Sequence, residues 1–228
     1  MLTAIAIVPS PPVMVPELAG SAAAEIADLR GAAVTAAGRL PSRWVAVGVS
    51  DVDAVIGRDA VGTFAGYGVD LPIRLSDAAT GPPAALPLCA LIAGWLRGLA
   101  ATSAVVDVRT YTADTAPQAA LAAGRALRRE LDASPEAVGV LVVAHGANTQ
   151  TAAAPGGHDP ASVPVQAELD NALARGDCAA LATLPDGIVG RVAYQVLAGL
   201  AEPGPRAAEQ LYRGAPYGVG YAVGVWTP

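Results

Sequence analysis

Three stretches of this chain are largely apolar and rich in β-branched residues, and each has the length of a strand. They are residues 2–8, 43–49 and 138–144. Such runs are typical of strands that are buried on both faces of a parallel sheet. Residues 103–111 are predicted to form a further strand between the second and the last of these runs. A shorter run, 71–75, fits an edge strand, and 215–226 alternates small and large residues in the manner of a last strand.

Segments with helical spacing of apolar residues lie between these runs. They cover residues 15–39, 83–101, 115–131, 165–174, 177–184 and 190–200. Because strand and helix patterns alternate, we predict an α/β fold with a mainly parallel central sheet and helices on both faces. Residues 59–70 are rich in glycine and are predicted to form a loop or an irregular hairpin. No linker divides the chain, so we expect a single domain over residues 1–228.

His145 is the strongest functional candidate, because the apolar run 138–144 ends on it. In open α/β sheets, ligands bind beyond the carboxyl ends of strands, so an imidazole there is placed to meet a ligand. Ser10 follows the first run, and Asp51 and Asp53 follow the second. If these strands are parallel neighbours, a nucleophile, an acid and a base share one edge. The alternative is that the histidine only packs and that the Asp and Ser residues cap turns.

The loop after His145 carries Asn148 and the only other histidine, His158. A solvated surface position is the simpler interpretation of His158, since its neighbours are glycine and proline. A metal site of two histidines and one carboxylate needs both His145 and His158. A Ser10–His145–Asp51 triad is geometrically possible, although Ser10 lies in a proline-rich bend and not in a Gly-x-Ser-x-Gly elbow.

Composition removes several classes of function. The chain contains no lysine, which excludes a P-loop lysine, Schiff-base catalysis and a pyridoxal phosphate anchor. Its net charge is −6 and its arginines are scattered, which argues against a nucleic-acid partner. Hydrophobic residues make up 53% of the chain and charged residues 15%. We therefore expect exposed apolar area and a homo-oligomer.

The cysteines and the first residues indicate the compartment. Cys89 and Cys178 lie in helix-like surroundings and are expected to be buried free thiols. The apolar run 2–8 has no basic residues before it and is too short for a signal sequence or a membrane span. We expect a cytoplasmic protein without membrane association.

Three features of the chain point to one family. The first strand is followed by PSPPVMVPE (9–17), which is similar to a Pro-His-Pro-Pro turn. The run that ends in His145 is followed by APGGHDP (154–160) and a helix-like segment that ends in Glu-Leu-Asp (168–170). Arg-Gly-Asp (175–177) and short helices continue the match. In this order the chain resembles the class III extradiol ring-cleaving dioxygenase superfamily, subunit-B-like, and most closely its actinobacterial branch.

The resemblance implies a ferrous iron held by two histidines and a glutamate, together with a separate histidine as acid/base. The iron would bind a catecholate and dioxygen. His145 matches the acid/base position. The iron ligands themselves do not match: the two histidine positions fall at Ser10 and near Asp51, and the glutamate position falls at Gln195. Serine and glutamine are poor replacements for imidazole and carboxylate as iron ligands. We therefore expect that the iron site is lost and that no cofactor is needed, with Fe(II) required only if the family chemistry survives.

Several functional hypotheses remain. We favour a protein that binds a small-molecule ligand in the crevice, or acts on it by metal-free acid/base chemistry at His145. Aromatic compounds are among the candidate ligands. The predicted pocket residues besides His145 are Ser10, Asp51, Asp53, Asn148, His158 and Gln195. The alternatives are an active dioxygenase with an altered site or a partner subunit's ligands, and a structural or interaction protein with a vestigial pocket. A tetrapyrrole chelatase, suggested by VVAHG (142–146), is weaker because that string is expected on an early strand.

Overall fold

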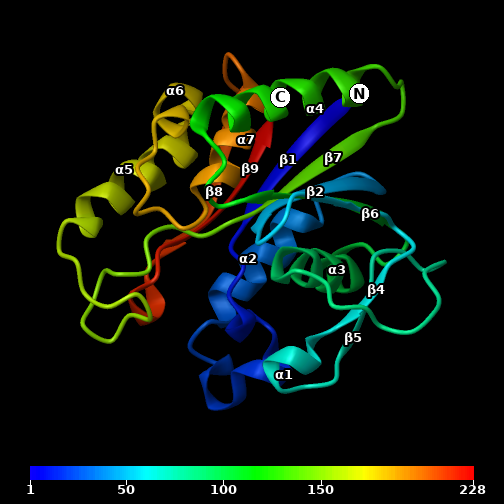
Figure 1. Ribbon diagram of the computed structural model, residues 1–228, viewed down its shortest axis with the longest axis horizontal. Coiled ribbons are helices and arrows are strands. Elements are labelled where there is room, and N and C mark those ends of the chain that lie inside the picture. Colours follow the sequence, from blue (N-terminus) through cyan, green and yellow to red (C-terminus); the bar gives the residue numbers. More distant parts are fainter.

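A mixed seven-stranded sheet forms the centre of the computed structural model, which describes all residues from 1 to 228 (Figure 1). Its strands are β1 (Leu2–Val8), β2 (Arg43–Ser50), β3 (Ala54–Ile56), β6 (Val105–Thr112), β7 (Val138–Val143), β8 (Ala207–Gly214) and β9 (Tyr221–Thr227). Their order across the sheet is β3-β6-β2-β7-β1-β9-β8. A separate hairpin consists of β4 (Val61–Thr63) and β5 (Pro72–Arg74).

The sheet is parallel only at its centre. Strands β6, β2, β7 and β1 run parallel, whereas β3, β9 and β8 are antiparallel to their neighbours. The prediction of an α/β fold is confirmed, but "mainly parallel" is correct only in part. The reason is the length of the connections, because a parallel neighbour needs a crossover of a dozen or more residues. Only residues 215–220 separate the neighbours β8 and β9. Residues 51–53 reverse the chain directly after β2, so β3 runs antiparallel to its neighbour β6, which is parallel to β2.

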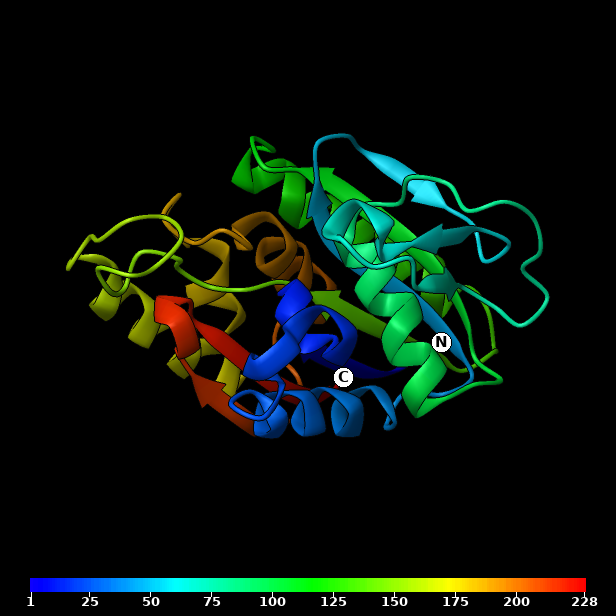
Figure 2. The same cartoon turned by 90° about the horizontal axis from the view of Figure 1, so that it is seen from below.

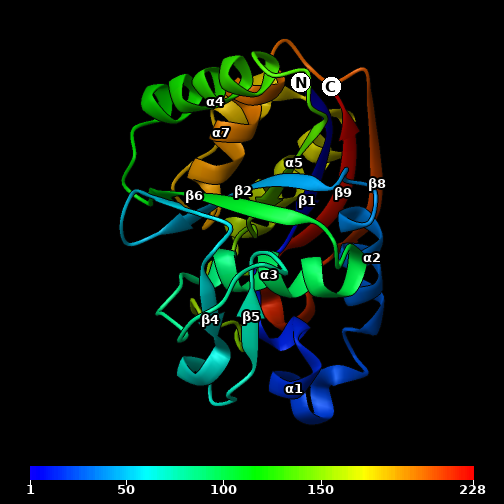
Figure 3. The ribbon, with the colours of Figure 1, turned by 90° about the vertical axis from the view of Figure 1, so that its right-hand side faces the viewer.

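Helices cover both faces of the sheet, as predicted (Figures 2 and 3). They are α1 (Pro16–Ala19), α2 (Ala27–Ala37), α3 (Leu88–Ala100), α4 (Pro117–Asp132), α5 (Ser162–Arg175), α6 (Cys178–Ala182) and α7 (Arg191–Ala201). Residues of α2 and α3 build the hydrophobic core on one face, and residues of α4, α5, α6 and α7 build the core on the other. Strand β7 contributes to both cores and is buried at every residue.

Several element boundaries differ from the predictions. The predicted helix 15–39 is broken into α1 and α2 by a 3₁₀ turn at Gly20–Ala23, where Gly20 adopts a φ of +53°. The helix predicted over 83–101 begins only at Leu88, directly after Pro87, whose backbone is extended. Run 71–75 contains β5, which pairs with β4 and makes the glycine-rich segment an irregular hairpin apart from the main sheet.

Two expectations about side chains and helices can be checked directly. Cys89 and Cys178 are buried free thiols, as predicted. Among the helices, none combines the length and the apolar character that crossing a bilayer requires.

Helices α4 and α7 approach each other so closely that glycine is required at their contact. A Cβ atom on Gly124 would lie 2.1 Å from the carbonyl oxygen of Val196, and one on Gly199 would lie 2.1 Å from that of Leu121. Real Cβ atoms do not come this near to a backbone oxygen, because the overlap is strongly repulsive. The two glycines therefore set the distance between these helices near the end of α7, which begins at the carboxyl edge of the sheet.

Substitution of Gly124 by alanine is expected to lower the free energy of unfolding by about 1–3 kcal/mol, because the added methyl group forces the helices apart. Gly31→Ala is the matched control, since Gly31 is also inside a helix but has no atom within 4 Å of a Cβ position. That control is expected to raise the free energy of unfolding by roughly 0.5–1 kcal/mol. Urea unfolding measures the free energy of unfolding of both variants. An equal increase of this free energy in the two variants would show that α4 and α7 can move apart without cost.

Candidate functional site

Ser10 and His145 lie against each other at the carboxyl edge of the sheet. Strand β7 lies between β1 and β2 and runs parallel to both, so the residues that follow these strands emerge on the same edge. Ser10 Oγ is 2.9 Å from His145 Nδ1, a hydrogen-bond distance. The Ser10 side chain is buried, because the residue is only 8% exposed.

The His145 ring is enclosed but keeps one free nitrogen. The ring of Tyr221 meets it edge-on, with the ring centroids 6.3 Å apart. His145 Nε2 makes no hydrogen bond within the protein. It is also not among the side-chain atoms that are buried without a partner, namely Nε of Arg43, Oγ of Ser76 and Nε2 of Gln150. Nε2 is therefore in contact with solvent.

Burial keeps this histidine neutral. Removal of the imidazole from water lowers the pKa of His145 to about 4, and no charged group contributes to the shift. Burial also raises the pKa of Tyr221 to about 12, so the neighbouring phenol is neutral as well. Ser10 either donates to Nδ1, which puts the ring proton on Nε2, or accepts from it, which leaves a lone pair there. In the first tautomer Nε2 donates a hydrogen bond to a bound molecule, and in the second it accepts a proton from one.

The backbone that follows His145 is joined to the segment before β9. Gly146 N–H donates to the carbonyl of Gly220 at 2.8 Å, and Gly220 N–H donates to the carbonyl of Ala147 at 2.8 Å. These two hydrogen bonds hold the residues next to His145 beside the residue that precedes Tyr221. The two rings of the site are therefore positioned by one backbone pairing.

The start of α7 holds the same loop from the other side. Gly190 N–H donates to the carbonyl of His145 at 2.9 Å, and the hydroxyl of Tyr194 donates to the carbonyl of Ala144 at 3.0 Å. Tyr194 is fully buried, so this second bond is shielded from water. The end of β7 is thus fixed by helix α7 as well as by the segment before β9.

Asp51 and Asp53 are not part of this arrangement. Both are exposed, and Asp53 Oδ1 accepts from the backbone N–H of Thr112 at 2.7 Å, as a turn-capping residue does. Alternation along β2 explains the placement of Asp51. Val45 and Val47 belong to the core under α4 and α7. Val49 and Asp51 are the next alternate residues, so they lie on that same face of the sheet and not on the face covered by α2 and α3.

Ser50 and Tyr221, which were not predicted as site residues, lie on the face of the sheet that carries Ser10 and His145. Ser50 shares its parity with Trp44 and Ala46, which pack under α2 and α3, and His145 shares the parity of β7 residues that pack there too. Tyr221 belongs to the same core. Alternate residues along β2 point to the same face, and this alternation could have identified Ser50 from the sequence. No pattern in the sequence around Tyr221 indicated that it would lie beside His145.

The remaining predicted pocket residues have partners other than His145 and Ser10, or are exposed. Gln195 is fully buried on α7, where its Oε1 accepts from Arg191 Nη1 at 3.0 Å and its Nε2 donates to the carbonyl of Ala182 at 3.4 Å. Asn148 is half-buried, and its carbonyl accepts from the N–H of Gly156. His158 is exposed in the loop. None of the three has a hydrogen bond to Ser10 or His145.

These residues do not fit the iron that the family resemblance implies. The Ser10 hydroxyl bonds to His145, and the Gln195 amide is engaged inside the protein by Arg191 and α6. No three His, Cys, Asp or Glu side chains converge closely enough to hold a metal ion. Hydroxyl and amide oxygens are also weak donors to ferrous iron compared with imidazole and carboxylate.

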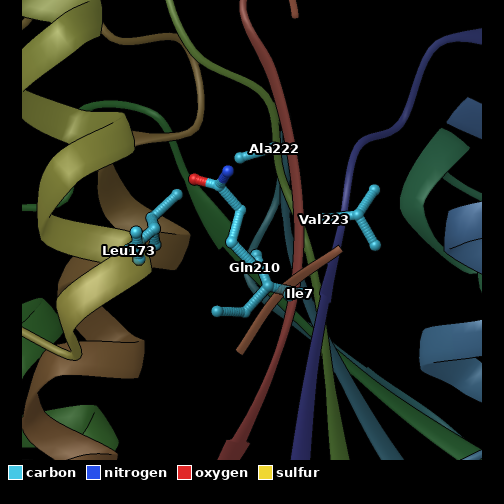
Figure 4. Close-up of a pocket in the computed structure, with 7 residues that line it drawn as sticks. Ile7, Leu173, Gln210, Ala222 and Val223 are labelled. Carbon is cyan, nitrogen blue, oxygen red and sulfur yellow. The ribbon is translucent and has the colours of Figure 1, made fainter. Parts of the chain in front are cut away.

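Neither Ser10 nor His145 lines any of the main hollows of the surface. The tightest is an apolar gap of about 10 Å³ between α5 and β9, into which Leu173, Ala222 and Ile7 face (Figure 4). A polar hollow of about 380 Å³ is lined by Gln150, Gln166, Asp170 and Arg213, among others. The Ser10–His145 pair therefore lies at the carboxyl edge of the sheet, outside these hollows.

The pKa of His145 makes the stability of the fold depend on pH. The His145 ring binds a proton only near pH 4 in the folded protein, whereas in the unfolded chain it binds one near pH 6.5. The stabilisation is fully present above about pH 6.5 and is lost as the pH falls toward about 4, by about 3 kcal/mol in total. Urea unfolding across this range should show a smaller loss in His145→Gln than in the wild type. Parallel curves for the two proteins would show that the ring is hydrated.

Comparison with known proteins gives no family for this chain. No protein-family model matches it, and no curated protein matches it either. What the protein does must therefore be inferred from Ser10, His145 and the residues that hold them.

Proposed function

We propose that this protein binds a small organic molecule at the carboxyl edge of the sheet and exchanges a proton with it through His145, without a metal. The observation that carries the proposal is the hydrogen bond between Ser10 Oγ and His145 Nδ1, which leaves Nε2 open to solvent on a neutral ring. A neutral imidazole accepts a proton at its free nitrogen and returns it once the ring is protonated, as acid/base chemistry requires.

The surroundings of the pair support this role. Ser10 fixes the orientation of the ring through Nδ1, in the way that a carboxylate does in other histidine sites. Because no charged group contributes to the lowered pKa of His145, the site suits a neutral or weakly polar ligand better than a charged one. The edge of the Tyr221 ring beside the imidazole is compatible with an aromatic ligand.

We further infer that the chain derives from the class III extradiol dioxygenase superfamily. The inference rests on the PSPP turn after β1, on the histidine at the end of β7 and on the His-Asp-Pro loop that leads into α5. In this view His145 keeps the acid/base position of the family, while Ser10 replaces an iron ligand and has become the partner of His145. We thus propose that the protein is a metal-free relative of ring-cleaving enzymes.

Ligand binding tests the proposed function. A thermal-shift screen with phenols and small carbonyl compounds is expected to find a compound that raises the Tm of the wild type. The shift should disappear in His145→Gln, shrink in Ser10→Ala, and remain in His158→Gln, which changes the exposed histidine. A shift of unchanged size in His145→Gln would refute the assignment, and no shift with any compound would favour a vestigial site.

Iron content distinguishes the proposed function from an active dioxygenase. Protein purified without oxygen and then supplied with ferrous iron is expected to retain far less than stoichiometric iron, because the Ser10 hydroxyl and the Gln195 amide are already engaged. Elemental analysis gives the answer directly. Near-stoichiometric iron, accompanied by turnover of a catechol under oxygen, would contradict the metal-free proposal.

A further inference from the structure

Gln166 on α5 is the buried polar residue that contacts the His145 loop directly. Gln166 is 4% exposed, and its Oε1 accepts from the backbone N–H of Ala147 at 2.8 Å. Its Nε2 donates to Asp170 Oδ1 at 2.7 Å, one helical turn further along α5. Both polar atoms of the amide are therefore engaged, one with the loop and one with the helix.

The Gln166 amide fills a slot between two backbone segments. A Cβ atom on Gly146 would lie 1.8 Å from Gln166 Oε1, and a Cβ atom on Gly220 would lie 2.1 Å from Gln166 Cδ. Gly146 and Gly220 are also the residues that pair through the backbone beside His145 and Tyr221. Only glycine leaves room for the amide at these two positions, so Gln166 packs directly on the junction that holds both rings.

Asp170 determines which way the amide faces. The carboxylate is 6% exposed, and its second oxygen, Oδ2, lies 2.8 Å from Arg213 Nε on β8. An ionised carboxylate only accepts hydrogen bonds, so the NH₂ group of Gln166 must point toward Asp170 and its oxygen toward Ala147. Arg213 and Asp170 thus prevent the amide from turning over, which would leave the buried N–H of Ala147 without an acceptor.

We propose that Gln166, oriented by Asp170, is a positioning residue that fixes the His145 ring by holding the amide group of Ala147. The inference rests on the proposed function, because it gives Gln166 a part in the same site. A side chain that only stabilised α5 would leave the exposure and the titration of His145 unchanged when it was removed. A positioning residue changes both.

The chain offers an internal reference for testing this role, because it has only two histidines, His145 and His158. Diethyl pyrocarbonate modifies the unprotonated nitrogen of imidazole. Mass spectrometry of the two histidine peptides gives the ratio of their modification rates, and exposed His158 corrects for differences in reagent and time. NMR titration of the two rings gives the pKa of His145 in the same samples.

Gln166→Met keeps the volume of the side chain and removes both hydrogen bonds. We expect the rate ratio of His145 to His158 to rise about fivefold, the change in loop opening that corresponds to one net hydrogen bond. The pKa of His145 should rise from about 4 toward 6.5. If this variant does not fold, Asp170→Asn gives the same readout, with a smaller change in the same direction.

Leu169→Ala is the matched control, because Leu169 is fully buried on the same helix and contributes to the core. It is expected to lower the Tm without changing the rate ratio or the His145 titration. A lowered Tm with an unchanged ratio and titration in Gln166→Met would overturn the inference and leave Gln166 a purely structural role.

The ligand found by the thermal-shift screen separates this inference from the proposed function. A shift that is lost in His145→Gln but fully kept in Gln166→Met would reject the role of Gln166 alone. A shift that is kept in both variants would reject the proposed function.

Discussion

The structure depends on the complete burial of β7. Every residue of this strand is buried, its two edges are paired with β1 and β2, and its side chains alternate between two separate cores. A polar side chain inside such a strand would lose its water without gaining a partner. The first polar side chain therefore comes where the strand leaves the sheet, and that residue is His145. The position of the site follows from where the core ends.

Burial also explains which elements could be predicted. Strands β1, β2 and β7 have apolar side chains on both faces over most of their length, so their runs are continuous and were identified within a residue or two of their ends. β6 alternates buried and half-exposed residues and was also identified within two residues of its ends. β8 was missed because it is an edge strand with charged and half-exposed residues such as Glu209 and Arg213. The antiparallel edges were missed because the run at 215–226 shows a strand without showing its direction. The direction of β9 follows from its short connection to β8, and the pattern of apolar residues did not indicate β8.

The site was only partly predictable for a related reason. Ser10 and His145 follow buried strands, and their meeting requires only that β1 and β7 are parallel neighbours. Asp51 follows β2 in the same way, but alternation turns it to the other face. Gln166 had a usable signal, because Gln166 and Asp170 share the helical stripe of Leu169 and Leu173. Polar residues on an apolar stripe indicate a buried hydrogen-bonded pair, but only the fold shows that its target is Ala147.

The pairing of β9 with β1 has a consequence for aggregation. Ile5 lies opposite Trp226, and Gly146 bonds to Gly220, so the last strand of the chain covers the edge of β1 and is joined to the loop that carries His145. Non-local contacts of this kind slow the folding of small domains. Whenever β9 is displaced, β1 exposes an unpaired edge, which is a template for aggregation. The last strand therefore protects the centre of the sheet from pairing with other chains.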